Sequence, residues 1–196
     1  MTTIIQHRRN TIAELEATDS RYGIEVDIRS YGQDLVTHHD PFVKGPLFAD
    51  WLHSFHHNTL ILNVKEEGLE ERVLELMRLH GIKNFFFLDQ SFPFLVKTAK
   101  TGERRCAVRV SEFESVETAL TLAREVDWIW VDCFSKFPLD GASAKRLKAA
   151  GFKLCLVSPE LQGRDAFSEV PRLRELLHAE RITPQAVCTK EPELWC

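Results

Sequence analysis

Residues 24–42 read IEVDIRSYGQDLVTHHDPF, and the rest of the chain is interpreted outward from them. Glu25 and Asp27 are two positions apart in an apolar run that we predict as a β-strand over residues 24–30. Alternate residues of a strand point to the same face, so both carboxylates are expected to point together. Hard divalent cations favour oxygen ligands of this kind. The stretch therefore predicts a pair of acids that binds a metal, although two solvated acids at a strand end remain an alternative.

Two histidines accompany this acid pair. His39 follows Asp27 by twelve positions, and His7 stands with Arg8 at the end of an earlier apolar run. His38 is the adjacent competitor, but alternation along the extended piece 34–39 points it to the other face. Two histidines, two acids and an arginine near strand ends suggest metal-assisted chemistry on a phosphate ester.

Composition limits the class of protein. The chain has 196 residues, which fits one domain, and 44% hydrophobic with 28% charged residues is typical of a soluble globular protein. The net charge of −4 argues against a nucleic-acid partner held by bulk electrostatics. No apolar run is long enough to span a membrane, and the N-terminus lacks a signal-peptide layout. We therefore expect a cytoplasmic protein.

The cysteines fit this expectation. There are five, an odd number, and no two of them form a C-x-x-C pair. We expect reduced thiols rather than disulfides or a zinc site, with the first four buried in apolar runs. They are Cys106, Cys133, Cys155, Cys188 and Cys196.

Strands and helices are predicted to alternate along the whole chain. The predicted strands are 3–8, 24–30, 59–65, 84–89, 106–110, 128–134, 153–158 and 186–189. The predicted helices are 12–21, 47–55, 69–80, 94–101, 115–126, 141–150 and 171–182. Eight β-then-α steps indicate a parallel sheet with helices outside. A doubly wound sheet is disfavoured because no G-x-G-x-x-G is present. We predict a single α/β domain over residues 1–196, a (β/α)₈ TIM-type barrel with short loops and without the final helix.

Polar residues follow most of the predicted strands, at the end where barrel enzymes place their active sites. They are His7, Arg8, Glu25, Asp27, Asn63, Lys65, Asp89, Arg109, Asp132, Ser158, Glu160 and Lys190. For Asp89, Arg109, Asp132 and Glu160, an inter-strand salt-bridge ring is at least as good an explanation as substrate binding. Arg164, in the loop 158–164 after the seventh strand, is a further candidate for binding phosphate.

A family resemblance rests on several of these positions. His7-Arg8, Asn10-Thr11, Glu25-x-Asp27 and the run from Asp34 to His39-Asp40-Pro41 resemble the pattern of the glycerophosphodiester phosphodiesterase family. The likeness is dense over residues 5–41 and continues as Asn63-x-Lys65 on the third strand. It implies a TIM barrel and a phosphoric diester hydrolase.

The resemblance also implies residue roles. His7 and His39 would be the acid and base, Arg8 and Lys65 would bind the phosphate, and Mg²⁺ or Ca²⁺ would be bound by Glu25, Asp27 and Asn63. The substrate would be a small glycerophosphodiester, or a glycerol- or sugar-phosphate polymer. In that family a neighbouring substrate hydroxyl attacks phosphorus and gives a cyclic phosphate that is then hydrolysed.

Three departures from the family pattern leave alternatives open. Arg9 replaces the glycine after His-Arg, and Asn63 replaces an acidic metal ligand, so Asp132 or Glu160 supplies the missing charge or metal affinity drops. The segment 39–58 is short, so we expect a pocket that is open or roofed by a partner chain, and a homo-oligomer remains open. A degenerate barrel that binds a phosphorylated ligand or a partner protein, or a lyase that stops at the cyclic phosphate, are the competing functions.

Overall fold

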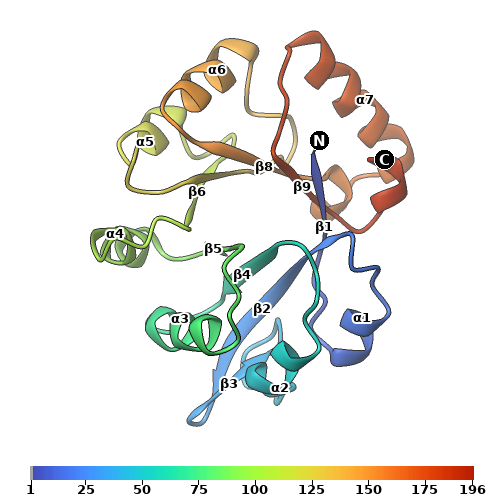
Figure 1. Cartoon of the computed structure of the whole chain (residues 1–196). Coiled ribbons are helices and arrows are strands. Elements are labelled where there is room, and N and C mark those ends of the chain that lie inside the picture. The colour runs from blue at the N-terminus through green and yellow to red at the C-terminus, as the bar shows by residue number, and fades with distance from the viewer. Residues whose placement is uncertain (1) are drawn as a thin grey trace. The chain divides into compact units, whose positions relative to one another are not determined.

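The computed structural model describes residues 2–196 and has the predicted alternation of strands and helices (Figure 1). The strands are β1 (Thr3–Gln6), β2 (Gly23–Tyr31), β3 (Asp34–Thr37), β4 (Leu60–Val64), β5 (Phe85–Leu88), β6 (Ala107–Val110), β7 (Trp128–Val131), β8 (Lys153–Val157) and β9 (Ala186–Thr189). The α-helices are α1 (Ile12–Glu16), α2 (Phe48–His53), α3 (Glu70–Leu79), α4 (Phe92–Lys100), α5 (Val116–Leu120), α6 (Gly141–Ala149) and α7 (Ala166–Ala179). Two 3₁₀ turns are η1 (Pro159–Gln162) and η2 (Pro192–Leu194).

The strand order confirms the predicted fold class. The order is β5-β4-β2-β1-β9-β8-β7-β6, and β3 joins only β2. The pairs β2–β4, β4–β5, β6–β7, β7–β8 and β8–β9 are parallel. Eight such strands with intervening helices form the α/β topology of a TIM-type barrel.

The chain divides into two compact units. Gln6–Thr101 contains β2 to β5 with α1 to α4. Gly102–Cys196, with the N-terminal residues up to Ile5, contains β6 to β9 with α5 to α7. The single domain expected over residues 1–196 stays a prediction.

β2 has buried side chains on both of its faces. Ile24, Val26 and Ile28 are fully buried on one face, and Glu25 and Asp27 are fully buried on the other. Such two-sided burial is typical of a strand covered on both sides in a parallel sheet. The alternation of the sequence therefore determines which face of β2 carries the acids.

A hairpin extends this strand. β2 and β3 are antiparallel, with Tyr31 opposite Asp34 and Ile28 opposite Thr37. Gly32, the first residue of the two-residue turn, has φ +63°, a value that glycine adopts at low cost. Figure 1 shows the hairpin in blue beside α2. The extended piece predicted over 34–39 is thus a short strand, β3, which adds to the eight predicted strands and ends at Thr37.

Two predicted helices are shorter in the structure. The helix predicted over 12–21 ends at Glu16, where the Thr18 hydroxyl donates a 2.8 Å hydrogen bond to the Glu14 carbonyl. The helix predicted over 115–126 ends at Leu120, and the Thr121 hydroxyl donates in the same way to Thr118. In both places a threonine side chain competes with the helical backbone pattern, which the apolar spacing did not reveal.

The last helix begins earlier than predicted. It was expected over 171–182, with Pro171 in its first turn, but α7 spans Ala166–Ala179 and contains Pro171 inside it. Asp165 caps the helix by accepting a 2.9 Å hydrogen bond from the backbone N–H of Ser168. The cap therefore decides the start, not the proline. Strands β1 and β7 are also shorter than the predicted strands 3–8 and 128–134, and they end at Gln6 and Val131.

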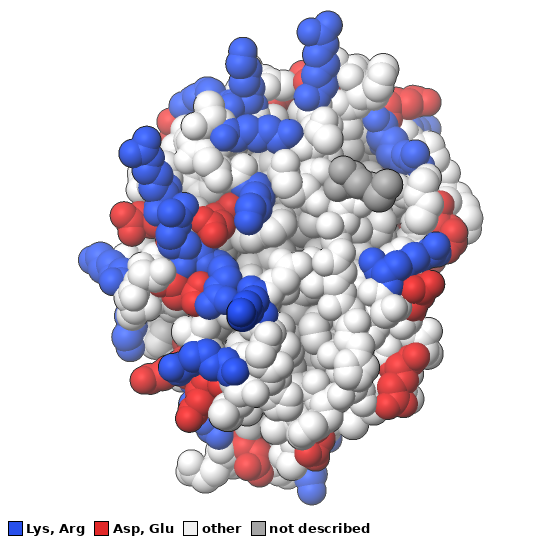
Figure 2. All heavy atoms as spheres, viewed as in Figure 1, with Lys and Arg blue, Asp and Glu red and all other residues white. Residues whose placement is uncertain are grey.

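The surface and the thiols agree with the composition. Cys106, Cys133, Cys155 and Cys188 are buried free thiols, as expected, and Cys196 is exposed. Basic and acidic side chains lie interspersed on the face shown in Figure 2, in keeping with the net charge of −4. None of the helices in residues 2–196 is long and apolar enough to cross a membrane.

Candidate active site

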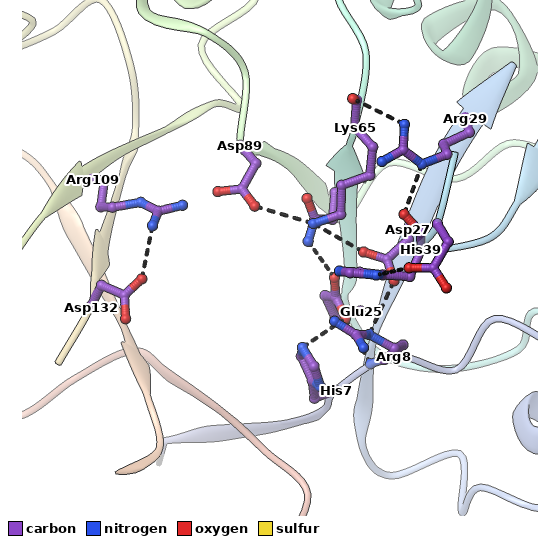
Figure 3. A network of polar contacts seen from close by, with 12 residues as sticks. His7, Arg8, Glu25, Asp27, Arg29, His39, Lys65, Asp89, Arg109 and Asp132 are labelled. Atoms are coloured by element: carbon purple, nitrogen blue, oxygen red, sulfur yellow. Dashed lines mark hydrogen bonds and ion pairs between the residues drawn. The ribbon is translucent and has the colours of Figure 1, made fainter. Parts of the chain in front are cut away.

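Two neighbouring strands of the unit Gln6–Thr101 bring the predicted residues together (Figure 3). In the parallel pair β2–β4, Asp27 lies opposite Asn63, and Glu25 lies opposite Ile61. Residues two apart share a face, so Lys65, just beyond β4, continues the face that carries Asn63. Alternation along two adjacent strands thus gathers two acids, an amide and a lysine on one surface.

Glu25 is enclosed by hydrogen-bond donors. Its Oε1 accepts a 2.7 Å hydrogen bond from the Asn63 amide, and its Oε2 accepts one of 2.6 Å from the backbone N–H of Arg8. Burial first, and the negative charge of Asp27 second, raise the pKa of the Glu25 carboxyl, which stands at about 7 in the fold. The hydrogen bond from Asn63, the charge of Lys65 and the hydrogen bond from Arg8 act in the opposite direction. Glu25 is therefore a carboxylate that another cation would stabilise.

Asp27 is held by one amide and two cations. Asn10 donates to its Oδ2 at 2.8 Å and accepts from its backbone N–H at 2.9 Å. The Arg8 Nε lies 3.3 Å from Oδ2, and the Lys65 Nζ lies 3.2 Å from Oδ1. The charge of this buried carboxylate is thus offset by its neighbours.

Arg8 adopts a backbone conformation that is costly for a residue with a Cβ. Its φ is +55°, in the left-handed region. This turn directs the backbone N–H of Arg8 to Glu25, while the guanidinium reaches Asp27 and the side chain as a whole is 40% exposed. The next residue, Arg9, donates its backbone N–H to the Glu25 carbonyl at 2.9 Å. Strain of this kind is often found at functional sites.

Lys65 links the acid pair to the next strand. Its Nζ lies 3.3 Å from Oδ2 of Asp89, in addition to the contact with Asp27. Asp89 follows β5 and has φ +60°. The ammonium group is therefore shared between two carboxylates and has an alternative partner if one of them is taken by another cation.

The two predicted histidines are placed differently. His7 has its Nε2 3.7 Å from Oε2 of Glu25, and its side chain is 15% exposed. His39 follows β3, its Nδ1 lies 2.8 Å from Oδ1 of Asp40, and its side chain is 43% exposed. His7 is thus in direct contact with the acid pair, and His39 lies in the loop that leaves the hairpin.

A divalent cation would need oxygen ligands at this site, and Asn63 offers one beside the two carboxylates. Oδ1 of Asn63 is buried and has no hydrogen-bond partner within residues 2–196. The described chain contains no cluster of three or more His, Cys, Asp or Glu side chains that could hold a metal ion. In place of a third acid, the site offers this amide oxygen beside two carboxylates. Mg²⁺ is commonly bound through one or two carboxylates with water completing its shell, so the residues fit such an ion.

The second unit carries a polar cluster of its own. Arg109 Nη1 lies 3.0 Å from Oδ2 of Asp132, an ion pair between β6 and the end of β7. Oδ1 of Asp132 accepts 2.6 Å and 2.9 Å hydrogen bonds from Gln162 and from the backbone of Cys133. This ion pair joins two of the four residues for which the sequence left a salt-bridge ring open as an alternative to substrate binding.

The loop after β8 also makes structural contacts. Oε1 of Glu160 accepts hydrogen bonds from the Thr189 hydroxyl at 2.7 Å and from the backbone N–H of Lys190 at 2.9 Å. Arg164 donates to the Ser135 carbonyl at 2.9 Å and to the sulfur of Cys133 at 3.0 Å. A metal-compensating role for Asp132 or Glu160, and a phosphate-binding role for Arg164, stay predictions.

Sequence reasoning missed two residues. Asn10 is part of the Asn10-Thr11 motif but has no predicted site role; in the structure Thr11 caps α1, in a capping box with Glu14, and Asn10 binds Asp27. The signal was present, because Glu three positions after Thr marks Thr11 as the cap. Arg29, on the same face of β2 as Glu25 and Asp27, donates a 2.7 Å hydrogen bond to the His39 carbonyl, and no motif predicted that contact.

Comparisons with known proteins give structural likeness only. No family model matches the sequence, and no curated protein matches it. A candidate glycerophosphoryl diester phosphodiesterase from Agrobacterium tumefaciens has a similar structure, with a TM-score of 0.73, 16% identity, and coverage of 99% of this chain and 95% of that one. A glycerophosphodiester phosphodiesterase from the same organism has a TM-score of 0.64 and 16% identity, with 100% and 99% coverage. A glycerophosphoryl diester phosphodiesterase from Parabacteroides distasonis has a TM-score of 0.67 and 12% identity, with 99% and 84% coverage.

These likenesses extend over nearly the whole chain and confirm the fold that the sequence resemblance implied. At such low identity they establish the fold alone, because one fold serves many reactions. The function has to be argued from the residues of the site.

Proposed function

We propose that this chain is a phosphoric diester hydrolase of the glycerophosphodiester phosphodiesterase family, which acts with a divalent metal on a glycerophosphodiester or a glycerol- or sugar-phosphate substrate. The observation that carries the proposal is the buried pair Glu25 and Asp27 in contact with His7, Arg8 and Lys65. The sequence motifs over residues 5–41 and the structural neighbours support it. The cytoplasmic location expected from the sequence stays a prediction.

The phosphate group of the substrate would bind the two cationic side chains. The Arg8 side chain is 40% exposed, and a guanidinium can donate two parallel hydrogen bonds to phosphate oxygens. Lys65 adds a point charge on the same face. Both groups favour the negative charge that develops on the non-bridging oxygens during transfer.

The histidines would move the protons. One imidazole takes the proton of the substrate hydroxyl beside the phosphoester as its oxygen forms a bond to phosphorus. The other gives a proton to the leaving alcohol oxygen as its bond to phosphorus breaks, which yields a cyclic phosphate. Water then opens the ring with the two roles exchanged. Histidine is the side chain most often used for such proton transfers.

A divalent metal would be held by Glu25, Asp27 and the buried Oδ1 of Asn63. When bound, it supplies positive charge to the phosphoryl oxygens. The carboxylates and the amide would hold it on the β2–β4 face, and Lys65 has Asp89 as a second partner within 3.3 Å. We propose Mg²⁺ or Ca²⁺ as this metal, since both ions bind oxygen ligands.

Histidine substitutions test the proposal. His7→Gln and His39→Gln should each lower hydrolysis of glycerophosphocholine, assayed with Mg²⁺ or Ca²⁺, by roughly 10²- to 10⁴-fold. His56→Gln changes an exposed histidine and serves as the matched control. Full activity in both site variants, or no hydrolysis by the wild-type chain, would overturn the assignment.

A binding protein without turnover is the second candidate function. Asn63 is neutral, and the charge of Asp27 is already offset by Arg8 and Lys65. The side chains of the site can therefore keep their arrangement without a bound metal, as a non-catalytic binding protein requires. Calorimetric titration with Mg²⁺ and Ca²⁺ separates the two candidates. Binding that is lost in Glu25→Gln and Asp27→Asn favours the hydrolase, and the absence of any such binding favours the non-catalytic barrel. Phosphorus NMR of the products would reveal a lyase by a persistent cyclic phosphate.

A further inference from the structure

Arg29 is the third polar residue on the acid-bearing face of β2, after Glu25 and Asp27. Its side chain is 15% exposed. Its Nε donates a 2.7 Å hydrogen bond to the backbone carbonyl of His39. A charged donor at this distance makes one of the stronger hydrogen bonds in proteins. One arginine on the site face therefore holds the backbone of the predicted histidine.

The other end of the same guanidinium reaches the neighbouring strand. Nη1 of Arg29 lies 3.3 Å from Oε1 of Glu66 and 3.5 Å from the backbone carbonyl of Lys65. Glu66 is fixed in turn, because its Oε2 accepts a 2.5 Å hydrogen bond from the Ser30 hydroxyl and a 3.3 Å one from the Ser30 backbone. Arg29 thus bridges the backbones of His39 and Lys65, which lie on either side of it in Figure 3. Glu66 is its anchored counter-ion.

The loop that carries His39 is held by Arg29 at the His39 carbonyl and by the backbone N–H of His38, which donates a 3.2 Å hydrogen bond to the Asp27 carbonyl. β3 ends at Thr37, and the His39 side chain is 43% exposed, with the neighbouring Asp40 at 2.8 Å from its Nδ1. The imidazole therefore goes where the backbone of this loop places it. A displacement of about 1 Å is enough to lower a reaction rate by about 10²-fold.

We infer that Arg29 is a positioning residue, which sets the place of His39 and of Lys65 through their backbone carbonyls, and that Glu66 and Ser30 hold Arg29 in the required orientation. The inference rests on the proposed function in so far as His39 and Lys65 act on the substrate. An ordinary ion pair that only joins β2 to β4 would predict a change in stability without a change in the catalytic step.

Arg29→Lys separates these two explanations. A lysine keeps the charge opposite Glu66, but a single ammonium group cannot replace the planar fork that reaches both Glu66 and the His39 carbonyl. We expect kcat for glycerophosphocholine to fall by about 10- to 100-fold, since misplacement of a reacting group acts on that scale. KM and the urea midpoint should stay near their wild-type values.

Arg72→Lys is the matched control. Arg72 also donates a hydrogen bond to a backbone carbonyl of the β2–β3 hairpin, that of Gln33, at 2.8 Å, but away from the site. Its kcat should equal that of the wild type. An Arg29→Lys variant with wild-type kcat, or one that loses only stability, would overturn the inference.

A second measurement does not depend on turnover. The imidazole signals of His39, assigned with His39→Gln, should be single and sharp in the wild-type chain and broadened or doubled in Arg29→Lys. They should be unchanged in Arg72→Lys. If the wild-type chain hydrolyses no phosphodiester, the proposed function fails while this comparison still tests the positioning role. Identical His39 signals in Arg29→Lys and the wild type would contradict it.

Discussion

Asn63 donates a 2.7 Å hydrogen bond from its side-chain amide to Oε1 of Glu25. This direction of the bond turns the amide oxygen away from Glu25 and leaves it buried. Asn63 therefore does two things at once: it compensates one carboxylate with a donor and contributes one oxygen to the space beside it. A third acid at this position would supply only oxygens.

Replacing this amide by an acid should couple stability to metal. Asn63→Glu loses the donor to Glu25 and adds a charge to the buried pair, so we expect the free energy of unfolding in EDTA to fall by roughly 1–3 kcal/mol. With the added charge, divalent binding should tighten by at least about tenfold. Urea unfolding with EDTA or Mg²⁺, together with calorimetry, measures both effects. Asn58→Glu, on an exposed site before β4, should change neither; metal binding that is unaltered in Asn63→Glu would contradict the ligand role.

Glu25 should make stability depend on pH. Its pKa of about 7 in the fold lies above the ordinary value of 4.5, because of burial first and the charge of Asp27 second. The folded chain then binds a proton more tightly than the unfolded chain, so this group lowers the free energy of unfolding as pH rises from about 4.5 to about 7. Glu25→Gln should remove that decrease in urea titrations in EDTA at pH 5, 6, 7 and 8. The same pH slope in the variant and the wild type would show that Glu25 is not the group responsible.

Arg8 allows backbone strain to be separated from side-chain chemistry. Arg8→Gly and Arg8→Ala both delete the guanidinium, but only glycine adopts φ +55° without a steric cost. We expect both variants to lose phosphodiesterase activity equally, while Arg8→Gly is more stable than Arg8→Ala by about 1 kcal/mol. Thermal or urea unfolding gives the difference. Equal stabilities would mean that the backbone relaxes in the alanine variant.

Glu112 should stabilise the loop after β7 except in acid. Burial raises the pKa of Glu112, but hydrogen bonds from the backbones of Lys136 and Ser135 and from the Ser135 hydroxyl outweigh it and lower the pKa to about 2. A carboxyl with a lowered pKa contributes stability fully above about pH 4.5 and loses it as pH falls toward 2. Glu112→Gln should therefore be less stable than the wild type at pH 7 and similar to it near pH 2. Glu125→Gln, on an exposed position, is the control, and an unchanged midpoint at pH 7 would refute the role.

The strands were predictable because their signal is local. Apolar runs and alternation found all eight strands of the barrel, and alternation alone placed Glu25 and Asp27 on one face of β2. Asn63 was predicted from the family resemblance, and its place opposite Asp27 follows from the register of β2 with β4. Helix ends were less predictable, since Thr18 and Thr121 end their helices by side-chain hydrogen bonds that the apolar spacing does not encode. Pro171 led to a predicted helix start that is too late, because the cap at Asp165 begins the helix before the proline.

The contacts of the site were only partly predictable. Asn10 and Asp27 are 17 positions apart, and their paired hydrogen bonds require the turn at Arg8 with its positive φ. The contact of Arg29 with the His39 carbonyl depends on the path of the chain after β3. Both contacts depend on how the folded chain brings distant residues together rather than on residue type. The spacing of apolar residues in the sequence does not predict them.

The two-residue hairpin turn has a consequence for the order of assembly. Closing it costs little chain entropy, so Asp27 and the residues that follow β3 are brought together by contacts that are short-range along the chain, such as the hydrogen bond from the His38 backbone N–H to the Asp27 carbonyl. Strand β1 is different, because the backbone N–H of its first residue, Thr3, donates to the Gln185 carbonyl across 182 positions. Contacts of low sequence separation tend to form fast and those of high separation slowly, and domains emerge N-terminal end first during synthesis. The acids and the histidine of the candidate site are therefore expected to meet early, in a nascent chain that still lacks the residues needed to complete the sheet.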